Sequence, residues 1–181
     1  KHAAMVSEFD KAVGTLFDTL EKENMLDNTM IWFVSDNGGL IATPAIDYVP
    51  DWALAAAIEW RFDIESTPRF VDFARTNFST AGSDNSPLPG GKGSLAEGGM
   101  RVPSVVYWKG QVAPSKAAQM VAVQDIMPTL LELAGSPVDA KTIDGRSVWP
   151  ILAVNAKLPV NDVISPMGPA PLAIALYRYP W

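Results

Sequence analysis

Apolar and polar positions along the chain predict an α/β protein that begins with a strongly amphipathic helix. Between residues 3 and 23, apolar side chains recur at steps of three and four residues, which predicts an α-helix with one apolar face. These positions are Met5, Val6, Phe9, Val13, Leu16, Phe17 and Leu20. Residues 30–35, Met-Ile-Trp-Phe-Val-Ser, then form a short continuous apolar run. Such a run after a helix predicts an interior strand that is buried on both faces.

Residues 41–89 interrupt this pattern and are expected to form a long excursion from the sheet. The segment has helical patches that break at Pro68, and the turn-rich run STAGSDNSPLPGGKG follows them. We expect one or two helices here, in a connection of the kind that often forms lids or binding loops. Its aromatic side chains, Trp52, Trp60 and Phe62, are expected to pack in a small core of their own rather than to line a lid.

The rest of the chain predicts one further strand and one further helix. RVPSVVYWKG, residues 101–110, is a strand candidate. VAVQDIMPTLLELAG, residues 121–135, predicts a short strand or turn and then a helix that ends at Gly135, with Asp125 as its candidate cap. Beyond Gly135 the chain is interrupted by prolines. Only two or three strands are indicated, each in need of neighbours, so we expect the chain to be part of a larger fold.

Composition and charge exclude several classes of function. The net charge is −6 and no basic cluster is present, which argues against nucleic-acid or anionic-membrane binding as the main role. No apolar run approaches the roughly 18 residues of a membrane span, and the first residues show no signal-peptide pattern. The 181 residues include no cysteine and one histidine, His2, for which we expect a surface or capping position. A metal site would therefore use oxygen ligands, which favours calcium, magnesium or manganese.

The stretch SDNGG, residues 35–39, carries the first candidate chemistry. Asp36 and Asn37 place a carboxylate and an amide oxygen at the carboxyl end of the predicted strand, where α/β proteins gather ligands. Gly38 and Gly39 let the backbone turn sharply. Metal binding is one interpretation, and an ordinary Asx turn that closes a strand is the other.

The stretch GGKGSLAEGGMRVP, residues 90–103, carries the second. Five glycines around Lys92 indicate a backbone that can approach an anion, with the lysine supplying positive charge. It does not match a Walker A sequence, because Gly93 follows the lysine and Ser86 stands where the first glycine belongs. On residue chemistry alone, a surface loop with a solvated lysine is an equal alternative.

The order of these two stretches, followed by DIMPTLLELAG and DGRSVWPIL, resembles the sulfatase family of arylsulfatase type. The resemblance covers residues 1–40 and 90–152. It implies part of an alkaline-phosphatase-like sandwich, with a central, mostly parallel sheet flanked by helices, which we expect to be incomplete in this chain. Residues 1–152 would be the C-terminal portion of the catalytic domain, and residues 153–181 a tail leading toward the family's C-terminal region.

The resemblance also implies roles for individual residues. Asp36 and Asn37 match the pair that helps to hold a divalent cation, usually calcium, against the sulfate, with magnesium or manganese as alternatives. Lys92 matches the lysine that contacts the sulfate group, so it is the catalytic and substrate-binding candidate. A cation and a lysine would neutralise charge on the non-bridging oxygens of a sulfate monoester. Glu97 and Arg101 match positions that we expect to hold the loop as a buried ion pair, with a direct catalytic role as the alternative.

The family's nucleophile has no counterpart in this sequence. It is a formylglycine made from Cys or Ser in the signature Cys/Ser-x-Pro-x-Arg, and it is expected in a missing N-terminal part, with further acidic ligands and the catalytic histidines. STPRF, from Ser66 to Phe70, is one residue short of that signature and follows SDNGG, so we do not expect a nucleophile there. The chain alone is therefore expected to be inactive.

The implied function is hydrolysis of sulfate monoesters by the full-length enzyme. Its substrate would be a small sulfate ester or a sulfated glycan, and its partner would be the missing N-terminal half of the same enzyme. Two alternatives stay open: a phosphonate monoester or phosphodiester hydrolase of the same superfamily, and a non-catalytic binding fragment. The family favours a periplasmic or secreted location, with a cytoplasmic one still open.

Overall fold

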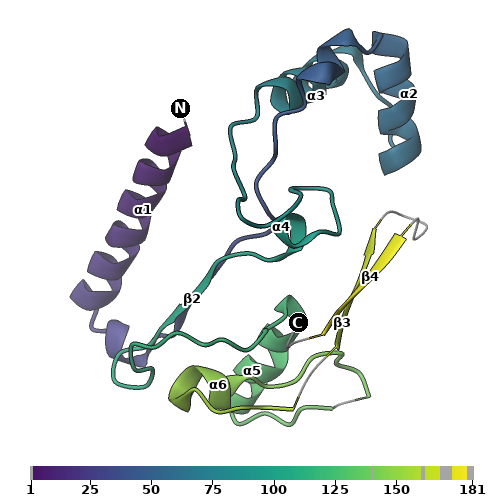
Figure 1. Cartoon of the computed structure of the whole chain (residues 1–181). Helices are drawn as coiled ribbons and strands as arrows, with labels where there is room; N and C mark the ends of the chain where they lie inside the picture. Colours follow the sequence, from purple (N-terminus) through teal and green to yellow (C-terminus); the bar gives the residue numbers. More distant parts are fainter. Residues whose placement is uncertain (1, 140, 160–161, 168–172, 179–181) are drawn as a thin grey trace. The chain divides into compact units, whose positions relative to one another are not determined.

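The computed structural model describes residues 2–139, 141–159, 162–167 and 173–178, and it divides the chain into two units. The first unit comprises Lys1–Phe33, Val105–Val163 and Leu176–Trp181. The second comprises Val34–Ser104 and Ile164–Ala175. Figure 1 shows the helices and strands of both units, which are described separately below.

The first unit begins with α1 (His2–Lys22), which confirms the predicted helix. Its aromatic residues meet the strands that follow: the ring centres of Phe9 and Phe33 are 5.7 Å apart, and those of Phe17 and Tyr107 are 5.0 Å apart. The side chain of His2 lies outside the described side chains. No described helix combines the length and the apolar character that crossing a bilayer requires. The ring contacts of Phe9 and Phe17 show that the apolar face of α1 packs on the strands that follow it.

The short 3₁₀-helix η1 (Leu26–Asn28) follows α1. The predicted strands are present as β1 (Ile31–Val34) and β2 (Ser104–Tyr107), and they pair with each other. The amide of Ser35 donates to the carbonyl of Pro103 over 3.2 Å, so the end of β1 meets the start of β2, as in an antiparallel pair.

Burial of β1 on both faces, as the apolar run predicts, is wrong for this chain. Phe33 and Val34 are each 38% exposed. The reason is that β1 has only one neighbouring strand among the described residues, so part of its surface has no packing partner.

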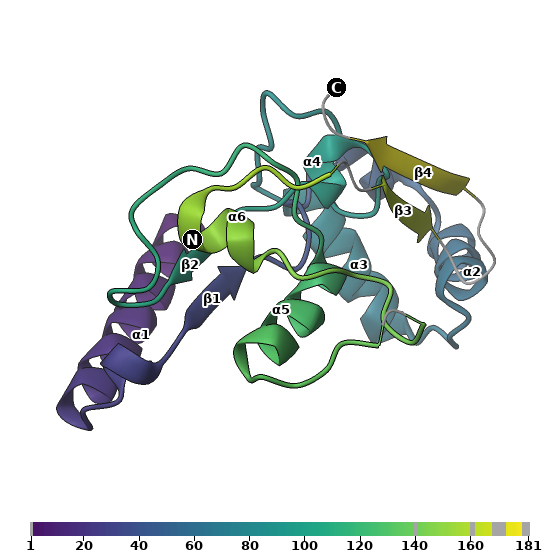
Figure 2. The same cartoon turned by 90° about the horizontal axis from the view of Figure 1, so that it is seen from below.

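A second pair of strands, β3 (Asp162–Met167) and β4 (Ala173–Arg178), was not predicted (Figure 2). The guanidinium of Arg178 donates from Nε to Oδ1 of Asp162 over 2.6 Å, which joins the two ends of the hairpin. The described strands thus form two two-stranded sheets in place of the expected central, mostly parallel sheet. A central sheet usually has about four to six strands, and neither described pair reaches that number.

The first unit also contains η3 (Val123–Asp125), α5 (Ile126–Leu133) and α6 (Trp149–Val154). The helix predicted within residues 121–135 is confirmed. It ends at Leu133, two residues before the predicted end at Gly135. Gly135 follows the helix with φ +68° and donates its amide to the carbonyl of Glu132 over 3.0 Å.

Asp125 is not the side-chain cap of α5 that the sequence predicts. Its buried carboxylate instead accepts from the amides of Ala122, over 2.9 Å, and Arg146, over 3.0 Å. The fully buried Thr129 continues this network, since its hydroxyl donates to the carbonyl of Asp125 and accepts from the amide of Val148. Asp125 thus uses its oxygens to join the segment before α5 to the segment before α6.

The second unit contains η2 (Pro44–Tyr48), α2 (Asp51–Phe62), α3 (Pro68–Thr80) and the one-turn helix α4 (Glu97–Met100). The one or two helices predicted for the excursion are confirmed as the two α-helices α2 and α3, which the 3₁₀-helix η2 precedes. They pack through a small core, which consists of Leu54, Ile58, Val71 and Ala74.

The expectation that Trp52 and Trp60 pack in this core is wrong, because they are 76% and 69% exposed. The buried face of α2 is defined by Leu54 and Ile58. Each tryptophan lies two residues from one of these, about 200° around the helix, and so faces solvent. The side chain of Phe62 lies outside the described side chains.

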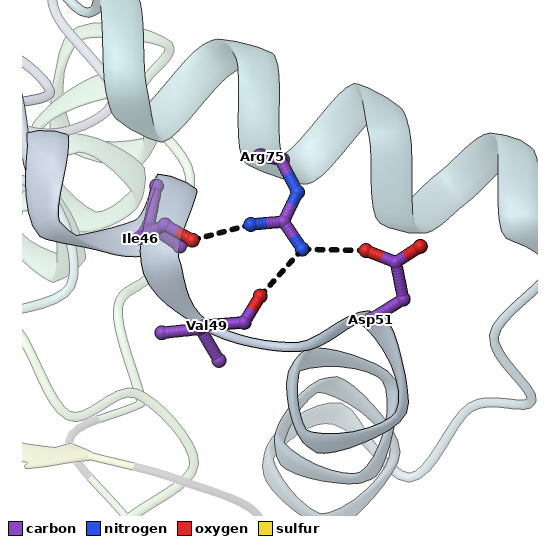
Figure 3. Close-up of polar contacts among 4 residues, drawn as sticks. All are labelled: Ile46, Val49, Asp51 and Arg75. Carbon is purple, nitrogen blue, oxygen red and sulfur yellow. Dashed lines mark hydrogen bonds and ion pairs between the residues drawn. The ribbon is translucent and has the colours of Figure 1, made fainter.

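Arg75 fastens η2 and the start of α2 to α3 (Figure 3). Its Nη2 donates to the carbonyl of Val49 over 2.7 Å and to Oδ1 of Asp51 over 2.6 Å, and its Nη1 donates to the carbonyl of Ile46. The side chain is 19% exposed, so these contacts are partly shielded from water. A single guanidinium therefore orders the first turn of the excursion.

Candidate functional site

The SDNGG stretch leaves β1 as a loop that presents two oxygen ligands. The carboxylate of Asp36 is exposed, and Asn37 is half-buried. Nδ2 of Asn37 donates to the carbonyl of Gly38 over 2.9 Å, which orients the amide and leaves Oδ1 as its acceptor. Among the described residues, none donates a hydrogen bond to the Asp36 carboxylate or to Oδ1 of Asn37. Both oxygens are thus available to a ligand.

Gly38 explains one of the two glycines, because the backbone of α4 lies directly against it. The amide of Gly38 donates to the carbonyl of Gly99 over 2.9 Å. A Cβ placed on Gly38 would lie 1.7 Å from the carbonyl oxygen of Gly98. The SDNGG loop and the second glycine-rich stretch therefore meet backbone to backbone, which only glycine permits at this position.

Lys92 reaches the same loop through its main chain. Its amide donates to the carbonyl of Gly39 over 3.0 Å. The preceding glycine is needed for this approach, since a Cβ on Gly91 would lie 2.6 Å from that carbonyl oxygen. The Lys92 side chain is exposed, and within the described part of the chain no ion pair engages its ammonium group. The structure thus brings the loops of all three predicted site residues, Asp36, Asn37 and Lys92, into direct contact.

Asn85 is a site-forming residue that sequence reasoning missed. Its Oδ1 accepts from the amide of Gly39 over 2.9 Å, and its Nδ2 donates to the carbonyl of Gly39 over 2.9 Å and to that of Gly90 over 3.2 Å. It stands in the turn-rich run before the second stretch, where several polar residues are equivalent by pattern. No signal in the sequence distinguishes it from them.

Glu97 and Arg101 form the expected ion pair, with 3.5 Å between Oε2 of Glu97 and Nη1 of Arg101. The pair is not buried as expected, because the Arg101 side chain is 62% exposed. Arg101 directly follows Met100, the last residue of α4, and so lies beyond the end of the helix. The pair closes a single helical turn, in keeping with a loop-holding role.

The STPRF stretch forms the start of α3. The hydroxyl and the amide of Ser66 donate to Oε1 of Glu59 over 2.7 and 3.1 Å, and these bonds lower the pKa of the Glu59 carboxyl. Thr67 caps the helix by accepting from the amide of Phe70, and Pro68 is its first residue. Ser66, Thr67 and Pro68 therefore stabilise the start of α3.

The donor set fits a divalent cation only in part. Calcium takes about six to eight oxygen ligands, and carboxylate and amide oxygens are suitable. Asp36 and Asn37 offer one of each. Across the described residues, no group of three or more His, Cys, Asp or Glu side chains is arranged to hold a metal ion. The two residues could thus contribute to a cation site that takes its other ligands from water, substrate or further residues.

A family model described as Sulfatase matches residues 1–136 of the chain. The chain belongs to the sulfatase family. The family and the structural likeness below give it an alkaline-phosphatase-like α/β fold. This confirms the family that SDNGG and GGKGSLAEGGMRVP indicate.

Several sulfatases are similar to the chain over most of its length. Arylsulfatase A of Homo sapiens is 29% identical over 152 residues, which are 84% of this chain and 23% of that protein. Steryl-sulfatase of Rattus norvegicus is 30% identical over 150 residues, covering 81% of this chain and 21% of the relative. N-acetylgalactosamine-6-sulfatase of Canis lupus familiaris is 25% identical over 182 residues, covering 99% and 28%.

A solved structure shows the same likeness in three dimensions. It is the crystal structure of Ps i-CgsB in complex with k-i-k-neocarrahexaose, with a TM-score of 0.61 and 26% identity over 97% of this chain and 35% of that one. In the sequence matches described before it, the chain spans only 21% to 28% of the length of the three sulfatases.

Proposed function

We propose that the chain forms part of the substrate site of an enzyme that hydrolyses sulfate monoesters. Membership of the sulfatase family supports this, as do the names of the relatives. The observation that carries the proposal is the hydrogen bond from the Lys92 amide to the Gly39 carbonyl, 3.0 Å long. It holds a free lysine next to the loop of Asp36 and Asn37, the two oxygen donors.

The chemistry of these three side chains suits a sulfate ester. Lys92 binds non-bridging sulfate oxygens and offsets the negative charge that they carry as the ester bond breaks. Asp36 and Asn37 hold a divalent cation, calcium in preference to magnesium or manganese, through a carboxylate and an amide oxygen. When bound, that cation would supply further positive charge to the sulfate group.

The nucleophile and the remaining cation ligands are proposed to come from residues beyond the 181 printed, in the same enzyme. The printed chain has no cysteine, and Ser66 is engaged at the start of α3. The partner is thus the N-terminal half of the enzyme, and the chain alone is inactive. The substrate is a small sulfate ester or a sulfated glycan, and the oligosaccharide in the similar crystal structure favours the glycan. The family favours a periplasmic or secreted location.

Substitution of Lys92 tests the substrate role. In the intact enzyme, Lys92→Ala is expected to lower kcat for a sulfate ester by about a hundredfold or more, as for other groups that stabilise transition-state charge. Lys116→Ala, an exposed lysine of the first unit, is the matched control and should leave kcat unchanged. Equal rates in the two variants would contradict the role of Lys92.

Substitution of Asp36 tests the cation role without an activity assay. Calcium should raise the thermal midpoint of the intact enzyme, and Asp36→Ala should abolish that rise because it removes the carboxylate ligand. Asp72→Ala, which removes an exposed carboxylate on α3, should keep it. A full calcium response in Asp36→Ala would contradict the assignment. Faster turnover of a phosphonate monoester than of a sulfate ester would instead favour the alternative substrate class.

A further inference from the structure

Asn85 has no part in the chemistry proposed above, yet its side chain joins the two loops of the candidate site. It makes three hydrogen bonds of 2.9 to 3.2 Å, two with the backbone of Gly39 and one with the carbonyl of Gly90. Gly39 lies two residues after Asn37, and Gly90 lies two residues before Lys92. One amide group therefore holds the cation-side loop and the anion-side loop at once.

We propose that Asn85 is a positioning residue that fixes the Lys92 loop relative to the loop of Asp36 and Asn37. The inference rests on the function proposed for those three residues. Its centre is the carbonyl oxygen of Gly39, which accepts from Nδ2 of Asn85 and from the amide of Lys92. A carbonyl has two acceptor positions, and here the two are taken by Asn85 and Lys92. Displacing Asn85 therefore disturbs the bond that places Lys92.

The packing around Asn85 is specific to its shape. A Cβ on Gly91 would lie 2.9 Å from Nδ2 of Asn85, and a Cβ on Gly39 would lie 3.1 Å from Oδ1. A Cβ on Gly39 would also lie 2.4 Å from Cβ of Ser83. Glycines on both sides thus leave a slot that the planar amide fills.

The chemistry of Asn85 is equally specific. The amide oxygen satisfies the Gly39 N–H, while the amide nitrogen satisfies the carbonyls of Gly39 and Gly90. Aspartate has nearly the same shape and keeps the acceptor, but it has no donor when ionised and faces both carbonyl oxygens with negative charge. Asn85→Asp therefore changes the contact to Gly39 and Gly90 with little change in volume, which makes it a sharper variant than Asn85→Ala.

The test measures affinity for inorganic sulfate in saturating calcium by calorimetry, on the intact protein. Asn85→Asp and Lys92→Ala should each weaken binding by about tenfold, roughly the effect of one lost hydrogen bond to a charged group. Because Asn85 acts through Lys92, the double variant should bind about as weakly as Lys92→Ala alone. Asn77→Ala is the control, since among the described residues the Asn77 side chain donates only within α3, to the carbonyl of Phe73.

A second readout needs no ligand. Amide hydrogen exchange at Lys92 should become about tenfold faster in Asn85→Asp, as expected when one hydrogen bond is weakened, and should stay unchanged in Asn77→Ala. Unchanged exchange at Lys92 in a folded Asn85→Asp would overturn the inference, as would additive losses of sulfate affinity in the double variant. Either result leaves the proposed function standing if Lys92→Ala still weakens sulfate binding. If Lys92→Ala binds sulfate normally, the proposed function and the inference fall together.

Discussion

A side chain at position 38 would collide with the backbone of α4. A Cβ on Gly38 would lie 1.7 Å from the carbonyl oxygen of Gly98 and 2.7 Å from its carbonyl carbon. A carbon–oxygen contact needs about 3.3 Å, so Gly38→Ala would force the two loops apart by about 1.6 Å. That displacement also breaks the hydrogen bond from the Gly38 amide to the Gly99 carbonyl.

The cost of Gly38→Ala follows from these two effects. Overpacking of this kind costs about 1–3 kcal/mol. The lost hydrogen bond costs about 0.5–1.5 kcal/mol more. We therefore expect the free energy of unfolding, measured by urea denaturation, to fall by about 1.5–4.5 kcal/mol.

Gly82 provides the matched control, because it lies in the same unit and a Cβ there would meet no atom within 4 Å. Gly82→Ala should change the free energy of unfolding by no more than about 0.5 kcal/mol. If Gly38→Ala is as stable as Gly82→Ala, the two glycine-rich loops do not meet as described. The proposed geometry of the site would then lose its basis.

Two further substitutions test other parts of the chain. Thr129→Val keeps the shape of a fully buried side chain but leaves the Val148 amide without its acceptor, so urea denaturation should show a loss of about 1–3 kcal/mol; a loss below that range would contradict the role of the hydroxyl. Ser66→Ala removes the main hydrogen bond that lowers the pKa of Glu59, so an NMR titration should show this pKa rising toward its usual value. Because the folded-state pKa of Glu59 is lowered, this bond stabilises the fold above the usual pKa, and that stabilisation is lost as the pH falls through the lowered pKa. An unchanged pKa in Ser66→Ala would count against that cause.

Local patterns predicted the elements whose formation depends on near neighbours. The apolar spacing in α1, the apolar run in β1 and the break at Pro68 are all patterns among residues close together in the sequence. The structure has α1 and β1 at the first two, and α3 begins at Pro68. The exposure of β1 was not predictable in this way. It depends on how many strands lie beside β1, which its own residues do not specify.

The hairpin of β3 and β4 was missed because prolines in this region argue against strands. Pro166 lies inside β3, where a central strand would lose a ladder hydrogen bond. Both strands of a two-stranded sheet are edge strands, however, so a proline can be placed with its ring nitrogen away from the partner. Proline does argue against a central strand, but the sequence did not reveal that β3 and β4 are both edge strands in the described sheet.

The contacts that assemble the candidate site were beyond sequence reasoning for a different reason. Asn85 and Gly39 are 46 residues apart, and neither residue type specifies the other. The glycines of SDNGG predicted a sharp backbone turn, and those of GGKG predicted a backbone that can approach an anion closely. They did not indicate that the closest partner of each glycine-rich loop is the other one, as the contacts of Gly38 and Gly91 show.

This arrangement separates assembly of the site from its chemistry. The two loops are joined by backbone amides and carbonyls and by the amide of Asn85, all of which are uncharged. Among the described contacts, the charged side-chain groups of Asp36 and Lys92 take no part in holding the loops together, and both residues are exposed. An ion pair between Asp36 and Lys92 would have joined the loops equally well, but it would have neutralised both groups and blocked them from ligands. Assembly through glycine and asparagine therefore leaves one carboxylate and one ammonium group exposed, the two charges that the proposed binding of a cation and a sulfate ester would require.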